Sequence, residues 1–418
     1  MNLHDDMTAM GQRAVAAARA LAMISTRKKN AILNAMAAEI IQQRNFIQDA
    51  NARDMDDGRT AGLSPALLDR LQLTDVRIDA MAQAVHEVAT LKDPVGQTIR
   101  RWSRPNGLVI RKRRVPIGVI GIIYESRPNV TADAATLCIK TSNAVILRGG
   151  KEAMNSNAAI AQALQKGGAR EGLPDAAVQL IETTDHDAIR ELVQMEGLVD
   201  LVMPRGGEAL IQAVMQHARV PVIKHYKGVC HVFVDESANL EMALAIIENA
   251  KCQRPGVCNA METLLLHNRI APVLLPQAAR YLMECGVELR GDDASRDFVP
   301  AIKPATENDW SAEYLALILA VRVVSSVKAA IEHINHYGSH HSDAIVTESK
   351  ASARLFTQEV DSAAVYINAS TRFTDGGEFG LGAEIGISTD KLHARGPMGL
   401  EELTTYKYIV TGQGQVRK

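Results

Sequence analysis

Cysteine is scarce in this chain. Five cysteines occur among 418 residues, an odd number, and none of them forms the C-x-x-C spacing typical of zinc sites. A chain this long and apolar does not depend on a disulfide framework, so the low count favours a reducing compartment. No metal site is predicted. Cys138, Cys230 and Cys285 fall in apolar segments and are predicted to lie in the core.

An excess of charge of one sign is also lacking. The 46 basic and 48 acidic residues leave a formal net charge of −2, which gives no indication of nucleic-acid binding. No apolar run approaches the ~20 residues of a membrane span. Arg13 and Arg19 interrupt the apolar stretch near the N-terminus, so no secretory signal is predicted. We expect a cytoplasmic protein with neither nucleic acid nor a membrane as partner.

The chain does contain a regular alternation of strand-like and helix-like segments. Residues 8–92 have helical spacing, and from 115 nearly all-apolar strands alternate with helices, the last of which starts at Glu208. A second such set runs from about 230 to 367, and a glycine-rich tail covers 373–399. This alternation predicts doubly wound parallel sheets in about two or three structural units.

Residues 97–115 follow another pattern. Apolar residues alternate with polar ones on both sides of Pro105-Asn106-Gly107, which predicts a hairpin. The second half carries the basic run 111–114. That run fits a solvated strand edge protected by charge, or a phosphate-binding surface.

The segment Gln253–Thr263 (QRPGVCNAMET) contains the strongest candidate for chemistry. Cys258 lies between a Pro-Gly turn and the amide of Asn259, ahead of an apolar strand, and Arg254 lies in the same turn. A cysteine in a polar turn near a cation can act as a thiolate nucleophile. A packed, unreactive thiol is the alternative, since cysteine is among the most buried residue types.

Two loops follow predicted strands at positions suited to a nucleotide. Arg148 and Lys151 come directly after the strand at 144–147, and Gly206 and Gly207 lie between a strand and a helix. Ligands of doubly wound sheets bind outside the carboxyl ends of the strands, and glycines allow a phosphate to approach a helix N-terminus. A solvated loop and a tight turn are the alternatives.

Two further polar segments are candidates for substrate binding. Arg127 can bind a carboxylate or phosphate in bidentate fashion, while Asn129 either contacts substrate or caps the next helix. His340 and His341 lie between a helix and a strand and are predicted to line a substrate loop, with a plain surface loop as the alternative.

Taken together, three long segments resemble the aldehyde dehydrogenase superfamily: Pro116–Thr131 (PIGVIGIIYESRPNVT), Gln253–Thr263 and Tyr337–Ile345 (YGSHHSDAI). Arg395–Lys407 (RGPMGLEELTTYK) also matches, and the resemblance covers nearly the whole chain. It implies a Rossmann-type cofactor domain, an α/β catalytic domain and a small β oligomerisation arm. The cofactor domain corresponds to residues 1–100 and 124–229, with 373–400 returning to it. The catalytic domain corresponds to 230–372, and the oligomerisation arm to 101–123 with 401–418.

The resemblance also implies roles for individual residues. Cys258 corresponds to the catalytic thiolate, with Asn259 beside it, and Ser126 falls near the position of the usual oxyanion asparagine. Glu313 corresponds to a glutamate that binds the nicotinamide ribose. Arg148, Lys151, Gly206 and Gly207 then bind NADP, and Arg127, Asn129, Arg254, His340 and His341 are assigned to the substrate.

One departure from the family pattern has chemical meaning. Family members that hydrolyse their acyl-enzyme place a glutamate where this chain has Ile223–Gly228 (IKHYKG), which contains no carboxylate. The resemblance therefore implies an acyl-phosphate reductase, converting L-glutamyl 5-phosphate to L-glutamate 5-semialdehyde and phosphate with NADPH, in proline biosynthesis. A homo-oligomer is expected, with a glutamate kinase as a possible partner.

Three alternatives remain. An ordinary aldehyde dehydrogenase would release a free acid without needing phosphate. A zinc-dependent enzyme similar to histidinol dehydrogenase would use His340 or His341 as a ligand. A superfamily member retained as a structural protein would bind no cofactor and have an unreactive Cys258.

Overall fold

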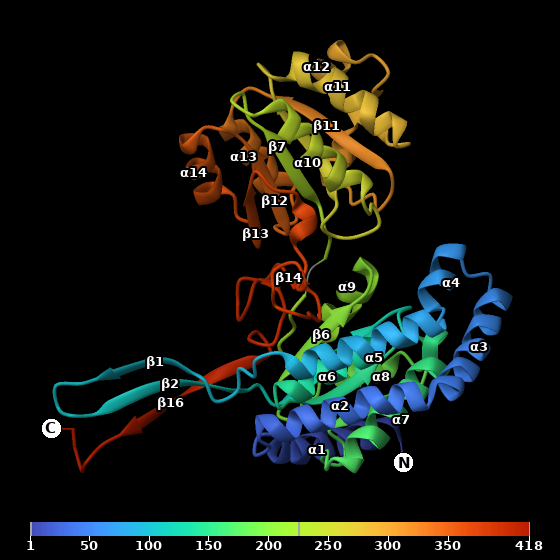
Figure 1. The fold of residues 1–418 in the computed structure, drawn as a ribbon, viewed down its shortest axis with the longest axis vertical. Coiled ribbons are helices and arrows are strands. Elements are labelled where there is room, and N and C mark those ends of the chain that lie inside the picture. Colours follow the sequence, from blue (N-terminus) through green and yellow to red (C-terminus); the bar gives the residue numbers. More distant parts are fainter. Residues whose placement is uncertain (1, 225, 418) are drawn as a thin grey trace. The chain divides into compact units, whose positions relative to one another are not determined.

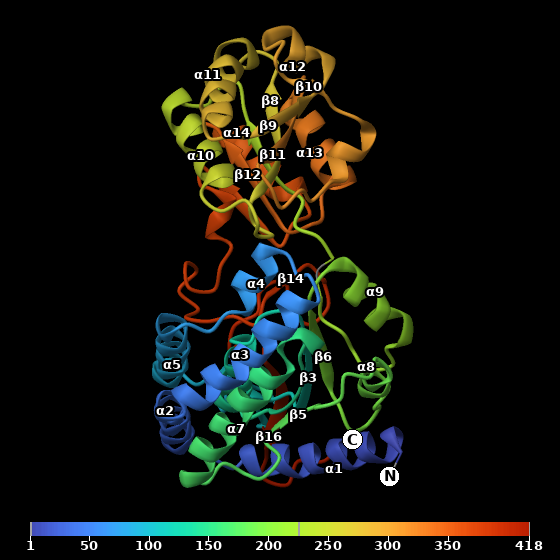
Figure 2. The same ribbon diagram turned by 90° about the vertical axis from the view of Figure 1, so that its right-hand side faces the viewer.

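The chain forms two compact units in a computed structural model that describes residues 2–224 and 226–417. The first unit comprises Met1–Lys224, Gly380–Gly386 and Met398–Lys418, and the second comprises His225–Phe379 and Ile387–Pro397. Each unit is described by itself (Figures 1 and 2). Of the predicted returning segment 373–400, residues 373–379 and 387–397 belong to the second unit. There β14 (Ile387–Ser388) pairs with β15 (Gly396–Pro397).

The first unit begins with five helices, as the helical spacing predicts. Side chains at four of their N-termini accept a backbone N–H, which satisfies donors that the helix leaves open. These residues are Asn2, Ser25, Ser64 and Thr74. The helices are α1 (Leu3–Leu21), α2 (Thr26–Gln42), α3 (Arg44–Thr60), α4 (Pro65–Leu71) and α5 (Asp75–Thr90).

A four-stranded parallel sheet forms the core of the first unit. Its strand order is β5 (Val178–Leu180), β4 (Ala144–Arg148), β3 (Val119–Tyr124), β6 (Leu201–Arg205). Every residue of β3 and β4 is buried, as expected for strands covered on both faces. The helices that follow are α6 (Val130–Lys140), α7 (Met154–Arg170), α8 (Asp187–Val193) and α9 (Glu208–His217). The predicted doubly wound sheet is confirmed. Strands β4 and β5 are added on one side of β3 and β6 on the other, so the switch point of the sheet lies between β3 and β6.

A three-stranded antiparallel ribbon extends from the first unit (Figure 1). The predicted hairpin is present as β1 (Thr98–Ser103) and β2 (Val109–Pro116), and β16 (Thr404–Thr411) pairs with β2. The ribbon ends earlier than the predicted residue 123, because β3 joins the parallel sheet. Gly118 separates the two strands at φ +137°, and a Cβ there would lie 2.1 Å from Asp200 Oδ2.

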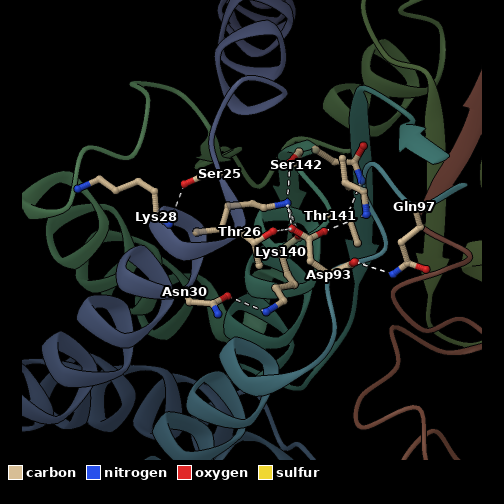
Figure 3. Close-up of polar contacts among 12 residues, drawn as sticks. Ser25, Thr26, Lys28, Asn30, Asp93, Gln97, Lys140, Thr141 and Ser142 are labelled. Carbon is tan, nitrogen blue, oxygen red and sulfur yellow. Dashed lines mark hydrogen bonds and ion pairs between the residues drawn. The ribbon is translucent and has the colours of Figure 1, made fainter. Parts of the chain in front are cut away.

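A buried polar cluster lies where the ribbon joins the helices (Figure 3). Lys29 Nζ is 2.6 Å from Asp93 Oδ2, and it donates to Lys140 O and Ser142 Oγ at 2.9 Å each. Gln97 Nε2, at the start of the ribbon, donates to Asp93 O at 2.6 Å. Burial lowers the pKa of Lys140 to about 8. The cluster thus ties α2, α6 and the first residues of the ribbon together.

The second unit contains a seven-stranded parallel sheet of order β10-β9-β11-β8-β7-β12-β13. Its strands in chain order are β7 (Cys230–Val234), β8 (Met261–His267), β9 (Glu288–Gly291), β10 (Lys303–Pro304), β11 (Ile318–Val324), β12 (Ser342–Val346) and β13 (Ala364–Ile367). Its helices are α10 (Leu240–Cys252), α11 (Ala271–Glu284), α12 (Asp293–Phe298), α13 (Val327–Tyr337) and α14 (Lys350–Glu359). The longer strands and helices match the predicted ones, whereas β9, β10, α12 and α14 were not predicted.

The cysteines follow the predicted burial with one exception. Cys138 and Cys230 are buried, but Cys285 is exposed. The prediction for Cys285 was wrong because this residue is the C-cap of α11 rather than part of its apolar face.

Candidate active site

The cysteine loop, residues 253–260, connects the end of α10 to the start of β8. Cys258 is partly buried within it, and Cys230 Sγ donates to Cys258 O at 3.2 Å from the neighbouring strand β7. The loop is short and closes with a hydrogen bond from Ala260 N to Val257 O at 3.1 Å. The thiol is therefore carried by a turn that two central strands hold in place.

Asn259 fixes the loop from the other side. Its buried amide donates to Thr374 O at 2.9 Å, its Oδ1 accepts from Arg372 Nη1, and its carbonyl accepts from Thr371 Oγ1 at 2.7 Å. Arg372 Nε in turn donates to Gln253 Oε1 at 2.9 Å. Asn259 thus binds residues 371–374, which comprise the short 3₁₀ turn η3 (Thr371–Phe373) and Thr374. These contacts of Asn259 position the backbone of the adjacent Cys258.

Glu313 lies beside the same loop. Its Oε1 accepts from Gly228 N at 2.8 Å, and Gly228 lies directly against the Cys258 backbone. A Cβ on Gly228 would be 2.0 Å from Cys258 O and 2.6 Å from Cys258 Cα. The structure therefore brings Glu313, Gly228 and Cys258 together. His225, in the segment that lacks a carboxylate, lies outside the described residues.

Gly228→Ala is expected to displace the cysteine loop, because the added methyl group would overlap backbone atoms that have no room to move. We expect a loss of activity of about tenfold or more. Gly256→Ala is the matched control, since its added Cβ would meet nothing closer than Leu315 O at 3.8 Å. Steady-state rates of the two variants test this; equal rates would contradict the close packing of Gly228 on Cys258.

The two predicted histidines have different environments. His341 is fully buried, and its Nδ1 lies 2.8 Å from Ser342 Oγ and 3.6 Å from Cys230 Sγ. His340 has a positive φ of 60°, and its Nδ1 lies 2.6 Å from Asp361 O. His341 thus contacts Cys230, which in turn contacts the cysteine loop at Cys258 O. His340 instead contacts the segment before β13. Across residues 2–224 and 226–417, no group of three or more His, Cys, Asp and Glu side chains could hold a metal ion.

Four of the five predicted cofactor-binding residues lie at one edge of the sheet in the first unit, and the fifth, Glu313, belongs to the second unit. Arg148 ends β4, Lys151 begins the short 3₁₀ turn η1 (Lys151–Ala153) after it, and Gly206 and Gly207 follow β6. Gly207 is the N-cap of α9, and a Cβ added there would meet nothing within 4 Å. The carboxyl ends of parallel strands are the usual ligand-binding edge of such sheets.

Arg148 is buried rather than solvated. Only 4% of it is exposed, and its Nε has no hydrogen-bond partner among the described residues. Its Nη1 donates to Gly149 O at 2.5 Å. Burial lowers the pKa of Arg148, an effect that the nearby Glu152 carboxylate opposes. A buried guanidinium with an unused N–H is suited to an anionic group.

Two carboxylates beside this edge were not predicted. Glu125 Oε2 accepts from Gly207 N at 2.9 Å, so a carboxylate already occupies the N-terminus of α9. Glu152 Oε1 accepts from Ser126 N at 2.6 Å and from Ser126 Oγ at 2.7 Å. Ser126 has φ +45°, and this contact holds it there. Glu125 lies within the matched segment Pro116–Thr131, whereas nothing in the sequence pattern indicated Glu152.

The remaining predicted residues of the first unit lie in the loop that follows β3. Arg127 and Asn129 are exposed, and Asn129 Nδ2 donates to Asp133 Oδ2 at 2.9 Å instead of capping α6. Burial raises the pKa of Asp133 to about 6, although the Asn129 hydrogen bond and the Arg205 charge oppose this. In the second unit, Arg254 is exposed in the cysteine loop.

Comparison with known proteins identifies the relatives of this chain. The profile of the aldehyde dehydrogenase family matches residues 3–311. A γ-glutamyl phosphate reductase of Geobacter metallireducens is 54% identical over 418 residues and one of Moorella thermoacetica is 56% identical over 418 residues, with 100% of each chain covered. The crystal structure of γ-glutamyl phosphate reductase from Thermotoga maritima matches with a TM-score of 0.97 at 48% identity, covering 99% of this chain and 100% of that chain.

The chain therefore belongs to the aldehyde dehydrogenase family of oxidoreductases, and the predicted fold class is confirmed. Within that family, its full-length similarity is to γ-glutamyl phosphate reductases. No helix among residues 2–224 and 226–417 is both long and apolar enough to cross a membrane.

Proposed function

We propose that this chain reduces L-glutamyl 5-phosphate to L-glutamate 5-semialdehyde and phosphate, with NADPH as reductant and Cys258 as nucleophile. The observation that carries the proposal is the full-length similarity to γ-glutamyl phosphate reductases, at 54–56% identity. The cysteine loop supports it, because Cys258 lies in a turn fixed by Asn259, Gly228 and Cys230. A fixed thiol beside backbone N–H groups suits acyl transfer.

In the proposed mechanism, Cys258 Sγ attacks the acyl carbonyl and forms a thioester, while phosphate leaves with the electrons of the broken C–O bond. The Cys258 backbone N–H is the proposed donor to the oxyanion, since Asn259 and Arg372 hold that part of the loop. Bound NADPH supplies the hydride that reduces the acyl group. Cleavage of the C–S bond then releases the semialdehyde and restores the thiolate.

The residues present fit the cofactor. The buried Arg148, with its unused Nε, and the exposed Lys151 are proposed to bind the adenosine phosphate end. Gly206 and Gly207 would admit the pyrophosphate at the N-terminus of α9, displacing the Glu125 carboxylate from Gly207 N. Glu313 is proposed to bind the nicotinamide ribose.

The thioester must be protected from water for this reaction. No carboxylate occurs in Ile223–Gly228. The carboxylate of Glu313 does reach this segment, where its Oε1 accepts a hydrogen bond from Gly228 N. Phosphate rather than water is therefore the proposed acyl acceptor in the reverse direction.

The proposal predicts that NADP reduction by glutamate semialdehyde depends on phosphate. We expect the rate to rise by about tenfold or more when phosphate or arsenate is added, because only these anions discharge the thioester. Formation of NADPH, followed by absorbance with and without phosphate, measures this, and a chelator should leave it unchanged. A rate independent of phosphate would instead indicate an ordinary aldehyde dehydrogenase that forms the free acid.

The ribbon suggests how copies of the chain associate. Among the described residues, its outer strands β1 and β16 each have one unpaired edge, and Tyr406, Tyr408 and Val410 are exposed on β16. We propose that the ribbon pairs with another copy of the chain in a homo-oligomer. A glutamate kinase, which would supply the acyl phosphate, remains the proposed metabolic partner, and the cytoplasm the proposed location.

A further inference from the structure

We propose that Arg372, together with Arg254, forms the site that binds the phosphate group of the acyl phosphate. This inference rests on the function proposed above. It assigns the phosphate to a residue from the segment after β13, which the sequence did not single out. The same guanidinium would hold inorganic phosphate in the reverse reaction.

Arg372 spans the two ends of the cysteine loop. Its Nε donates to Gln253 Oε1 at 2.9 Å, and its Nη1 donates to Asn259 Oδ1. Gln253 precedes Cys258 and Asn259 directly follows it. Two of the five N–H groups of the guanidinium therefore hold it against both ends of the cysteine loop, and three remain for a ligand.

The charge around Arg372 favours an anion. Neither Arg372 nor Arg254 forms an ion pair with a carboxylate in the part of the chain that the structure describes. Burial lowers the pKa of Arg372 and the neighbouring Arg254 lowers it further, whereas Cys258 and Asp375 oppose both effects. A bound phosphate dianion would reduce the repulsion between Arg372 and Arg254 and would thereby stabilise both cations near Cys258.

A groove of about 220 Å³ opens beside Arg372. Its lining includes Asn249, Gln253, Asp375 and Glu378. Asp375 Oδ1 accepts from Gly377 N at 2.9 Å and from Glu378 N at 3.4 Å, so this acid is bound within its own turn. The groove therefore offers the amide of Gln253 and the guanidinium of Arg372 as donors, together with the carboxylates of Asp375 and Glu378.

This placement has a consequence for the reaction. When Cys258 Sγ bonds to the acyl carbon, the C–O bond to phosphate breaks and its electron pair moves to the phosphate oxygen. A guanidinium beside that oxygen stabilises the charge that develops. In reverse, it holds phosphate in position to attack the thioester, which favours phosphate over water.

The test compares Arg372→Ala and Arg372→Lys with the wild type in phosphate-dependent NADP reduction. We expect KM for phosphate to rise about 10- to 100-fold in Arg372→Ala, the cost of one charge-assisted contact, and less in Arg372→Lys. KM for NADP should change less than about twofold. Arg254→Ala should raise KM for phosphate by a smaller factor, and Arg280→Ala, an exposed arginine on α11, should not change it.

A second readout separates phosphate binding from support of the loop. Phosphate should protect Cys258 from iodoacetamide in the wild type but not in Arg372→Ala, with protection measured relative to the alkylation rate of each protein without phosphate. An unchanged KM for phosphate would overturn the proposal. So would a uniform loss of rate in Arg372→Ala with protection by phosphate retained, since Arg372 would then only support Asn259. Phosphate-independent activity in the wild type would instead overturn the proposed function itself.

Discussion

Cys258→Ser is expected to abolish phosphate-dependent NADP reduction, with a loss of at least about 10⁴-fold. A serine hydroxyl in the same turn is a far weaker nucleophile than a thiolate. Binding of NADP to the variant should be unchanged, because Arg148 and Gly207 belong to the other unit. The rate and the cofactor affinity, measured together, check this.

Cys285→Ser is the control for that substitution. Cys285 is the exposed C-cap of α11 and takes no part in the cysteine loop. We expect wild-type rates from it. If Cys258→Ser kept more than about a tenth of the wild-type rate, Cys258 would not be the nucleophile.

Lys251→Met is expected to destabilise the second unit by about 3–5 kcal/mol, because it leaves a buried carboxylate without its cation. Lys251, at the end of α10, and Glu262, on β8, have fully buried side chains, and Lys251 Nζ lies 2.6 Å from Glu262 Oε2. Glu262 Oε1 also accepts from Leu315 N at 3.1 Å, near Glu313. The pair therefore joins the two ends of the cysteine loop to the Glu313 segment, and activity should fall with stability.

The effect of Lys251→Met should depend on pH. Burial is the main cause that raises the pKa of Glu262 to about 7, above its ordinary value. A carboxyl group with a raised folded-state pKa favours the folded state when it is protonated, and this contribution is lost as pH rises through that pKa. Removing the ammonium raises the pKa further. The loss of stability should thus be smaller at pH 5 than at pH 8.

Denaturant unfolding measures both effects. Lys303→Met removes an exposed partner of Glu288 and is the control, for which we expect a change of less than about 1 kcal/mol. Lys251→Met/Glu262→Met should be more stable than Lys251→Met alone, since no unpaired charge remains. If Lys251→Met and the wild type had the same free energy of unfolding at pH 8, the Lys251–Glu262 pair would not stabilise the second unit.

Much of the fold followed from the sequence because its signals are local. The all-apolar runs of β3 and β4 and the short loops after them predicted both the parallel sheet and the edge where Arg148 and Gly207 meet. The Pro-Gly turn before Cys258 likewise predicted a fixed thiol between a helix and a strand.

Other features depend on contacts between distant segments and could not be predicted from local patterns. Arg372 reaches the cysteine loop only because the chain returns to it after β13, and Lys251 and Glu262 carry charges that a sequence pattern places at the surface. Arg148 was predicted as a loop cation but is buried at the end of β4. The strand β9 and the helix α12 are too short to produce a clear period.

The most direct test of the account follows the first turnover of the wild-type protein with glutamate semialdehyde and NADP in the absence of phosphate. We expect a burst of a single equivalent of NADPH per subunit, after which NADPH formation stops and mass spectrometry finds the γ-glutamyl group on Cys258. Added phosphate should discharge that group and restore turnover. Continued NADPH formation without phosphate, with free glutamate as the product, would contradict the account, because water would then be the acyl acceptor.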